Sequence, residues 1–258
     1  MSRRALFVAP LYADTFPHVP GAEVLEVRLK SCLEDFGDYE FQALRGIVER
    51  KTRLPAIAKL ADTTGEIFFY FYGHGYVRNS RTGVFVTSDA QPDDEGVLMA
   101  EVLDYCLRSG AREVVVVLDC CHAGAAIGPE RHLDSIGKEL LTPGRVLLAG
   151  CASHQKGWID NRGDKSLGVF SWHVLQGLEG AAATPGNEHI RGSSLGQYVI
   201  DAFGAWNQHP ILLHREMGDR KCVITKAPNN PVRQGRTARE NSARKFAVPF
   251  IRSQTFVG

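Results

Sequence analysis

The strongest structural signal in the chain is the segment Glu113-Val-Val-Val-Val-Leu-Asp-Cys-Cys-His-Ala-Gly124. It contains five consecutive apolar residues, four of them β-branched, which is typical of a strand buried on both faces of a parallel sheet. The run ends in a cluster of reactive side chains, Asp119, Cys120, Cys121 and His122. Open parallel sheets bind ligands beyond the carboxyl ends of their strands, so we expect a functional site here.

A second buried strand lies upstream. Ile67-Phe-Phe-Tyr-Phe-Tyr72 is apolar and aromatic, and Gly73-His74-Gly75 follows it directly. Glycine permits tight turns and close approach to the backbone. Because the carboxyl ends of parallel strands meet at one edge of a sheet, the sequence predicts that His74 and a cysteine lie at the same edge.

Predicted strands and helices alternate along the chain, which favours an α/β fold with a mostly parallel central sheet and helices on both faces. The expected strands are Arg4–Ala9, Tyr39–Leu44, Ile67–Tyr72, Val84–Thr87, the strand from Glu113, Arg145–Gly150 and Cys222–Thr225. The expected helices are Ala22–Phe36, one that begins near Pro55 and passes Leu60, Val97–Leu107, Leu167–Leu178 and Ser194–Trp206. No glycine-rich fingerprint or Walker lysine follows the first strand, which disfavours nucleotide-binding versions of this architecture.

Composition excludes several classes of protein. The chain has 258 residues, of which 44% are hydrophobic and 23% charged, as in ordinary globular proteins. A net charge of +1 gives no reason to expect a nucleic-acid or membrane partner. No apolar run approaches the roughly 18 residues that span a bilayer, and the N-terminus lacks a signal peptide, so we expect a cytoplasmic protein. The six cysteines are scattered in apolar segments, which is typical of reduced thiols.

The chain is expected to form one domain over residues 1–228, followed by a basic tail at 229–258. Residues 127–144 contain prolines and glycines with little periodicity and are the best candidate for a long mobile loop. The tail has few helix or strand signals and a net charge of +5.

The histidine and the cysteines suggest nucleophilic chemistry. A cysteine attacks a carbonyl as its thiolate, so it needs a base nearby and hydrogen-bond donors for the oxyanion. His74 can supply the base, and the backbone N–H groups of Gly75 and of the nucleophilic cysteine can supply two donors. Either residue type alone is more often structural, a core cysteine or a turn histidine. The pair, each member just past a buried strand, favours catalysis.

Two segments resemble a known family. Tyr72-Gly73-His74-Gly75 and Leu118-Asp-Cys-Cys-His-Ala-Gly124 are similar to the two signature segments of the caspase-like cysteine proteases, closest to metacaspases and bacterial orthocaspases. The resemblance runs from about Ala5 to about Thr225. It implies a three-layer α/β/α sandwich, with a large-subunit-like part at 1–126, a linker at 127–144 and a small-subunit-like part at 145–228. Animal caspases have Gln where this chain has Asp119, which makes them the weaker match.

The resemblance also implies roles for single residues. Cys121 is the nucleophile and Cys120 its small structural neighbour, while Gly124 lets the chain turn into a helix. Asp119 lies in the specificity pocket and selects Arg or Lys, and we assign Tyr72 to substrate binding beside it. Asp119 has a structural alternative, in which it caps a turn or binds the backbone. Metacaspases carry an Asn-Asp pair early in the first helix, whereas this chain has Val24-Leu25.

The function implied is a cysteine endopeptidase that cleaves protein substrates after Arg or Lys. Cleavage at Arg131 or Lys138 in the 127–144 loop, by the enzyme itself or by an upstream protease, is the expected activation step. The basic tail could act as an inhibitory substrate mimic or bind a partner, and the sequence does not choose between these. The alternative function is a catalytically silent caspase-like module for binding or signalling.

We expect no cofactor and no metal ligands. The acidic turn Asp89, Asp93, Asp94 and Glu95 could bind calcium, but its spacing is not that of an EF-hand. Cys151 and His154 could be imagined as a zinc site with Cys120–His122. Adjacent cysteines diverge, however, and the chain has no C-x-x-C pair.

Overall fold

The computed structural model describes residues 2–12, 16–79, 82–91, 94–127, 142–160, 166–184, 186, 188–204, 207–227 and 247–249. Its centre is a sheet in which β7 is buried along its whole length, as the apolar run predicts. The strands follow the order β12-β8-β7-β3-β1-β2, and all pairs are parallel except β12 with β8. Their bounds are β1 (Arg3–Pro10), β2 (Glu40–Gly46), β3 (Glu66–Tyr72), β7 (Glu113–Asp119), β8 (Arg145–Ala149) and β12 (Ile211–Arg215).

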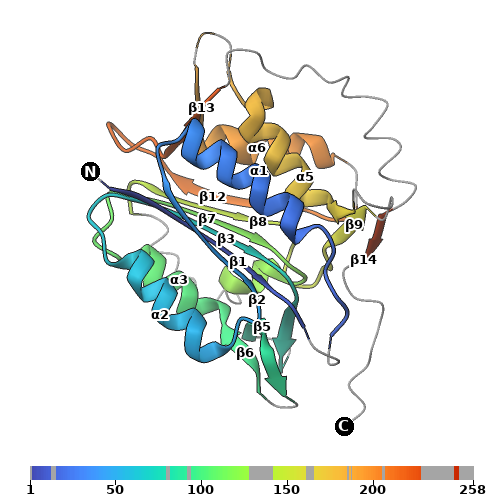
Figure 1. Cartoon of the computed structure of the whole chain (residues 1–258). Coiled ribbons are helices and arrows are strands. Elements are labelled where there is room, and N and C mark those ends of the chain that lie inside the picture. Colours follow the sequence, from blue (N-terminus) through green and yellow to red (C-terminus); the bar gives the residue numbers. More distant parts are fainter. Residues whose placement is uncertain are drawn as a thin grey trace.

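Helices cover both faces of this sheet (Figure 1). On one face lie α1 (Ala22–Asp35), α5 (Val169–Gln176) and α6 (Gly192–Phe203), and on the other α2 (Arg50–Ala61) and α3 (Met99–Leu107). Each helix layer buries its own apolar cluster against the sheet. The predicted α/β fold with a mostly parallel central sheet is therefore confirmed. None of the described helices is long and apolar enough to cross a bilayer.

Three smaller sheets extend the core. The first consists of β4 (Gly75–Arg78), β5 (Thr82–Gln91) and β6 (Asp94–Leu98), and the second of β10 (Leu167–Gly168), β9 (Trp158–Asp160) and β14 (Ala247–Pro249). The third pairs β11 (His189–Arg191) with β13 (Val223–Lys226). The strand expected near the end of the domain thus pairs with β11, outside the central sheet.

The register of the central sheet brings the two motifs together. Tyr72 on β3 is paired with Asp119 on β7, and the N–H of Gly73 donates to the carbonyl of Asp119 at 3.1 Å. Both strands end at the same edge, so the residues that follow them are neighbours.

Several boundaries differ from expectation. Helix α2 begins at Arg50, so Pro55 lies inside it rather than at its start. The missing N–H of Pro55 leaves a carbonyl one turn back, at exposed Lys51, where water can bind it. The acidic turn proved to be the β5–β6 hairpin, and α3 starts at Met99 rather than Val97. The helix expected at 167–178 begins as β10, continues as α5 and ends in a π-turn at Gly177–Ala181.

Candidate active site

His74 follows β3 and is fully buried. Its Nε2 lies 2.7 Å from the carbonyl oxygen of Pro17, and its backbone N–H donates to the hydroxyl of Tyr12 at 2.8 Å. A carbonyl can only accept, so the proton of the neutral ring sits on Nε2 and the lone pair on Nδ1. Nδ1 is buried and has no hydrogen-bond partner among the described residues. The ring is packed against Tyr12 and Phe16, with centroid distances of 4.7 and 5.4 Å.

The protonation state of His74 follows from this environment. Burial lowers its pKa to about 4, outweighing the Pro17 carbonyl, which favours the charged ring. The imidazole is therefore neutral at physiological pH. The Nδ1 lone pair of the neutral ring can accept a proton, but the lowered pKa makes the buried ring a weak base until its environment becomes more polar.

The two adjacent cysteines lie on opposite faces of the sheet, as neighbours at a strand end should. Cys121 belongs to the apolar layer under α1, α5 and α6, which also contains Tyr12 and Phe16. Cys120 belongs to the layer under α2 and α3. Cys121 thus shares its layer with the two rings that enclose His74.

Gly75 joins the histidine turn to the cysteine turn by direct contact. A Cβ at this position would lie 2.1 Å from the carbonyl oxygen of Cys121, so no larger residue fits without displacement. The N–H of Val86 donates to the carbonyl of His74 at 3.1 Å, which is one of the two bonds of a hydrogen-bonded pair, while the N–H of His74 donates to Tyr12 instead. Since such pairs alternate along an antiparallel ladder, the N–H of Gly75 points away from β5.

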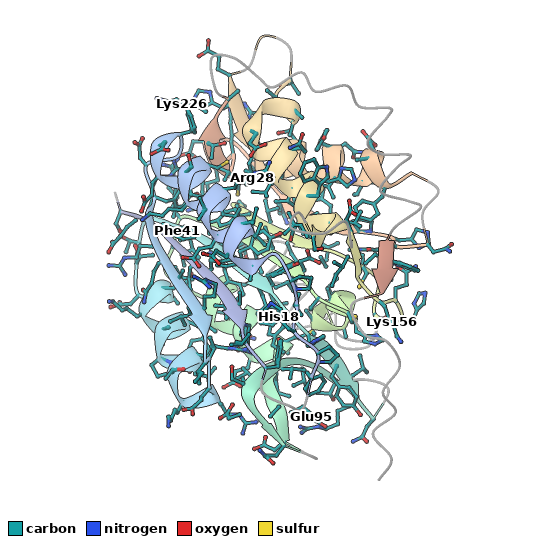
Figure 2. All side chains as sticks on the ribbon, turned by 45° about the vertical axis from the view of Figure 1, so that its right-hand side comes forward. His18, Arg28, Phe41, Glu95, Lys156 and Lys226 are labelled. Carbon is teal, nitrogen blue, oxygen red and sulfur yellow. The ribbon has the colours of Figure 1, made fainter. Side chains whose placement is uncertain are left out.

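The Cys121 thiol is closed off from solvent. Its Sγ accepts a hydrogen bond from the N–H of Gly157, and its side chain is fully buried. Burial raises its pKa to about 12, against the opposing effects of the Gly157 amide and the charge of Lys156. Lys156, labelled in Figure 2, stands in the same loop. Among the described residues Cys121 forms no hydrogen bond with His74, although both follow strands that end at the same edge of the sheet.

Gln155 fastens the loop that carries Gly157. Its carbonyl accepts the N–H of His122 at 2.8 Å. Its side-chain Oε1 accepts the N–H groups of Ala152 at 3.1 Å and His209 at 3.0 Å, and its Nε2 lies 2.7 Å from His209 Nδ1. These contacts hold the Gly157 amide over Cys121.

The Asp119 side chain is fully buried, and only one of its two carboxyl oxygens has hydrogen-bond partners among the described residues. Its Oδ2 accepts the backbone N–H of Ser171 at 3.1 Å and the Ser171 hydroxyl, in the first turn of α5. Its Oδ1 is buried with no hydrogen-bond partner among the described residues. Burial raises the pKa of this carboxyl to about 7, although both Ser171 bonds oppose the shift. One oxygen therefore caps a helix, as the structural alternative expects, and the other has no hydrogen-bond partner among the described residues.

Tyr72 connects two loops beside Asp119. Its hydroxyl donates to the carbonyl of Pro20 at 2.7 Å and accepts the N–H of Gly168 at 3.0 Å. A Cβ at Gly168 would lie 2.5 Å from Asp119 Oδ2 and 3.1 Å from the Tyr72 ring. Gly168 therefore lies against both side chains, and a larger residue would collide with them. Tyr72 also lines a cavity of about 390 Å³, whose lining includes neither His74 nor Cys121. Of the pair that departs from the metacaspase pattern, Val24 lines this cavity and Leu25 is buried in the core.

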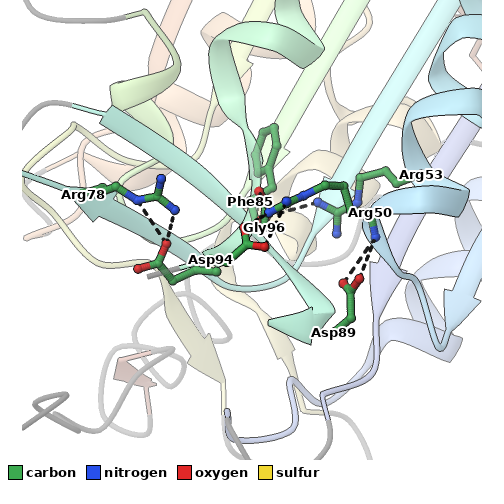
Figure 3. A network of polar contacts seen from close by, with 8 residues as sticks. Arg50, Arg53, Arg78, Phe85, Asp89, Asp94 and Gly96 are labelled. Atoms are coloured by element: carbon green, nitrogen blue, oxygen red, sulfur yellow. Dashed lines mark hydrogen bonds and ion pairs between the residues drawn. The ribbon is translucent and has the colours of Figure 1, made fainter. Parts of the chain in front are cut away.

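The described carboxylates of the acidic turn are bonded to arginines (Figure 3). The carboxylate of Asp89 accepts the backbone N–H of Arg50, and the Arg50 guanidinium pairs with Asp94. Glu95 pairs with Arg78, while Asp93 lies outside the described residues. Within the described part of the chain no group of three or more His, Cys, Asp or Glu residues could hold a metal ion, whether calcium here or zinc near Cys151 and His154.

Arg53 supports the strand behind the histidine turn, a role that the sequence did not suggest. It is fully buried and donates to the carbonyl of Phe85 at 3.3 Å (Figure 3) and to that of Val86 at 3.0 Å, both on β5. Burial lowers the pKa of its guanidinium to about 10. Because Val86 is paired with His74, Arg53 fixes the strand on which the histidine turn rests.

The turn after β7 also differs from expectation. The residue in the left-handed region is His122, with φ of 59°, rather than Gly124. His122 Nδ1 lies 2.8 Å from the carbonyl of Ser153, which ties the turn to the neighbouring loop. Gly124 is required by a close contact, since a Cβ there would lie 2.7 Å from the backbone N of Ser153. The turn leads into a short 3₁₀ helix at Ala123–Ile127.

The remaining sequence expectations fall outside the described residues. Arg131 and Lys138 lie in the undescribed part of the 127–144 loop, and most of the 229–258 tail is likewise not described. All six cysteines are free and buried.

If the Gln155 side chain holds this loop over Cys121, its removal should expose the Cys121 thiol. We expect Gln155→Ala to raise the rate of Cys121 alkylation by iodoacetamide at pH 7.5, by at least about tenfold for each pKa unit by which the thiol returns towards its ordinary value. Tandem mass spectrometry distinguishes Cys121 from Cys120, which should stay unmodified. Gln197→Ala is the matched control, because this exposed residue of α6 has a side chain that, within the described part of the chain, bonds Asp201 alone. Equal rates in the two variants would contradict the account.

The chain was also compared with known proteins. No protein-family model matches it, and no curated protein sequence does. The case for a function therefore rests on the residues and their geometry.

Proposed function

We propose that the chain is a cysteine endopeptidase of the caspase-like type, closest to metacaspases and orthocaspases, with His74 and Cys121 as its catalytic pair. The observation that carries the proposal is the orientation of His74. The Pro17 carbonyl holds the Nε2 proton, which leaves the lone pair on Nδ1, and the ring packs against Tyr12 and Phe16, which share an apolar layer with Cys121. The contact of Gly75 with both the Cys121 carbonyl and the Cys120 sulfur places the histidine turn against the cysteine turn, without distinguishing the two thiols.

The reaction follows from these groups. His74 Nδ1 takes the proton of the Cys121 thiol, and the thiolate attacks the scissile carbonyl carbon. The N–H groups of Gly75 and Cys121 stabilise the oxyanion. When the C–N bond breaks, the imidazolium gives its proton to the leaving amine, and water then hydrolyses the thioester to restore the thiol and release the acid. Pro17 keeps the ring oriented throughout, because an imidazolium donates to its carbonyl at least as well as the neutral ring does.

Catalysis requires the Gly157 amide to leave Cys121. The buried thiol and the buried imidazole are both neutral, and solvent must reach them before the thiolate forms. We assign this opening to cleavage in the 127–144 loop, at Arg131 or Lys138, by the enzyme itself or by an upstream protease. Residues 145–149 form β8, whose carboxyl end leads directly into the loop that covers Cys121.

Asp119 is proposed to set the preference for Arg or Lys. A buried carboxylate with one unpaired oxygen attracts a cationic side chain and repels an acidic one. Tyr72 lies beside it and shapes the approach. The partners are protein substrates and an activating protease, and the six free thiols support a reducing, cytoplasmic location.

One observation favours a second function. His74 and Cys121 are both buried and not hydrogen-bonded to each other in the described residues, as in a caspase-like module that binds partners without catalysis. Such a module needs no opening of the Gly157 loop.

Peptide turnover separates the two functions. We expect the protein, after cleavage of the 127–144 loop by an added protease, to hydrolyse fluorogenic peptides ending in Arg or Lys and not those ending in Asp. Cys121→Ala should lower kcat by at least about a thousandfold, because a nucleophile is lost. Cys120→Ala, the adjacent thiol on the other face, should keep most of the activity. Absence of turnover under all conditions would favour the silent module, and loss of activity in Cys120→Ala alone would overturn the choice of nucleophile.

The raised pKa of Asp119 predicts a pH-dependent preference. Above about pH 7 the carboxyl is charged and attracts Arg, and below that value it is protonated and loses this attraction. The ratio of kcat/KM for an Arg peptide to that for its uncharged citrulline analogue should therefore rise from pH 6 to pH 8. Because both peptides use the same catalytic pair, effects of His74 and Cys121 cancel in the ratio. Asp119→Asn should give a low, pH-independent ratio, and a flat ratio in the wild type would contradict the role.

A further inference from the structure

The C-terminal part of the chain returns to the candidate active site. Strand β14 pairs antiparallel with β9, with Ala247 opposite Asp160, Val248 opposite Ile159 and Pro249 opposite Trp158. Figure 1 shows β14 beside β9, with β9 between β14 and β10 in the sheet order. This strand was not expected from the sequence of the tail.

The register shows which backbone groups hold β14. Pro249 has no N–H, and the N–H of Trp158 donates instead to Gln208 Oε1 at 3.1 Å. Pro249 and Trp158 are therefore a non-hydrogen-bonded pair, and by alternation Val248 and Ile159 exchange the ladder hydrogen bonds. Ala247 and Asp160 are again a non-bonded pair. The docking of β14 depends on the main chain of Val248.

The direction of β14 leads to the nucleophile. β9 begins at Trp158, directly after Gly157, whose N–H is bonded to Cys121 Sγ. Since β14 is antiparallel to β9, the chain runs from Ala247 to Pro249 towards the Gly157 end. An extended peptide bound to this edge of β9 in the same direction would therefore pass its main chain towards Cys121.

Peptides commonly bind by adding a strand to a sheet edge. We propose that β14 occupies the edge of β9 to which the main chain of a peptide substrate adds, so that the C-terminal segment competes with substrate in cis. This inference rests on the proposed peptidase function, because it takes Cys121 as the target of the bound peptide. A tethered segment acts at an effective concentration in the millimolar range, so even a weak, three-residue pairing can compete.

The test compares two proline variants of the full chain. Val248→Pro removes the N–H that bonds Ile159, whereas Ala247→Pro puts the same residue at a neighbouring position whose N–H points away from β9. Both are made in the Cys121→Ala protein, and binding of a fluorescein-labelled tetrapeptide ending in arginine amide is measured by fluorescence anisotropy. We expect roughly tenfold tighter binding in Val248→Pro, as a millimolar competitor is removed, and about the affinity of the parent in Ala247→Pro.

Hydrogen exchange at the Ile159 amide reports docking of β14 without any catalysis. It should be faster in Val248→Pro than in the parent and unchanged in Ala247→Pro. Unchanged exchange in Val248→Pro would contradict the hydrogen bonding of Val248 to Ile159. Faster exchange with unchanged peptide affinity would contradict the proposal that β14 competes with substrate.

Both readouts use the inactive protein, so they are separate from the fate of the proposed function. If the proteins with Cys121 intact cleave no peptide, the peptidase proposal fails. Tighter peptide binding in Val248→Pro would still show that β14 competes with a peptide for the edge of β9. In an active protein, Val248→Pro should lower KM and leave kcat unchanged.

Discussion

The parallel pairing of β3 with β7 is the constraint on which the rest of the site depends. It sets Tyr72 opposite Asp119 and bonds the Gly73 N–H to the Asp119 carbonyl at 3.1 Å. From that point each strand continues into a turn, one with His74 and Gly75 and the other with the two cysteines. A slip of one residue would exchange the faces of Cys120 and Cys121, so the register also decides which thiol shares a layer with the histidine.

Burial shapes the chemistry of every titratable group at this edge. It makes the thiol of Cys121 harder to ionise, the ring of His74 harder to protonate and the carboxyl of Asp119 harder to charge. In the closed form the thiol and the imidazole are thereby neutral at pH 7, and the carboxyl is only partly charged. Neutral groups are the least costly to bury, so the same packing that stabilises the fold keeps the candidate site at rest. Admission of solvent would weaken all three shifts, whereas a cationic substrate would lower the pKa of the carboxyl and of the thiol without raising that of the imidazole.

The sequence predicted the parts of the site that depend on side-chain pattern. The apolar runs before Gly73 and Asp119 were long enough to identify two buried strands, and the parallel fold then places His74 and the cysteines at one edge. It did not predict the parts made by the main chain: the Pro17 carbonyl that orients His74, the Gly157 amide that covers Cys121, and the pairing of Val248 with Ile159. Every residue has these groups, so composition and periodicity carry no signal for them. β12 was not predicted because its apolar run, Ile211–Leu213, is short. The start of α2 was predicted too late because proline suits the first turn of a helix better than its interior, and Pro55 lies inside α2.

Covalent capture tests the central claim, that His74 activates Cys121, most directly. Wild type and Gln155→Ala would be incubated with a peptidyl-arginine acyloxymethyl ketone, whose methylene carbon a thiolate attacks with loss of the carboxylate, and analysed by intact and peptide mass spectrometry. The account predicts a single adduct on Cys121, formed faster in Gln155→Ala, retained in Cys120→Ala and strongly slowed in His74→Ala. An adduct on Cys120, or labelling of Cys121 at the same rate without His74, would contradict it.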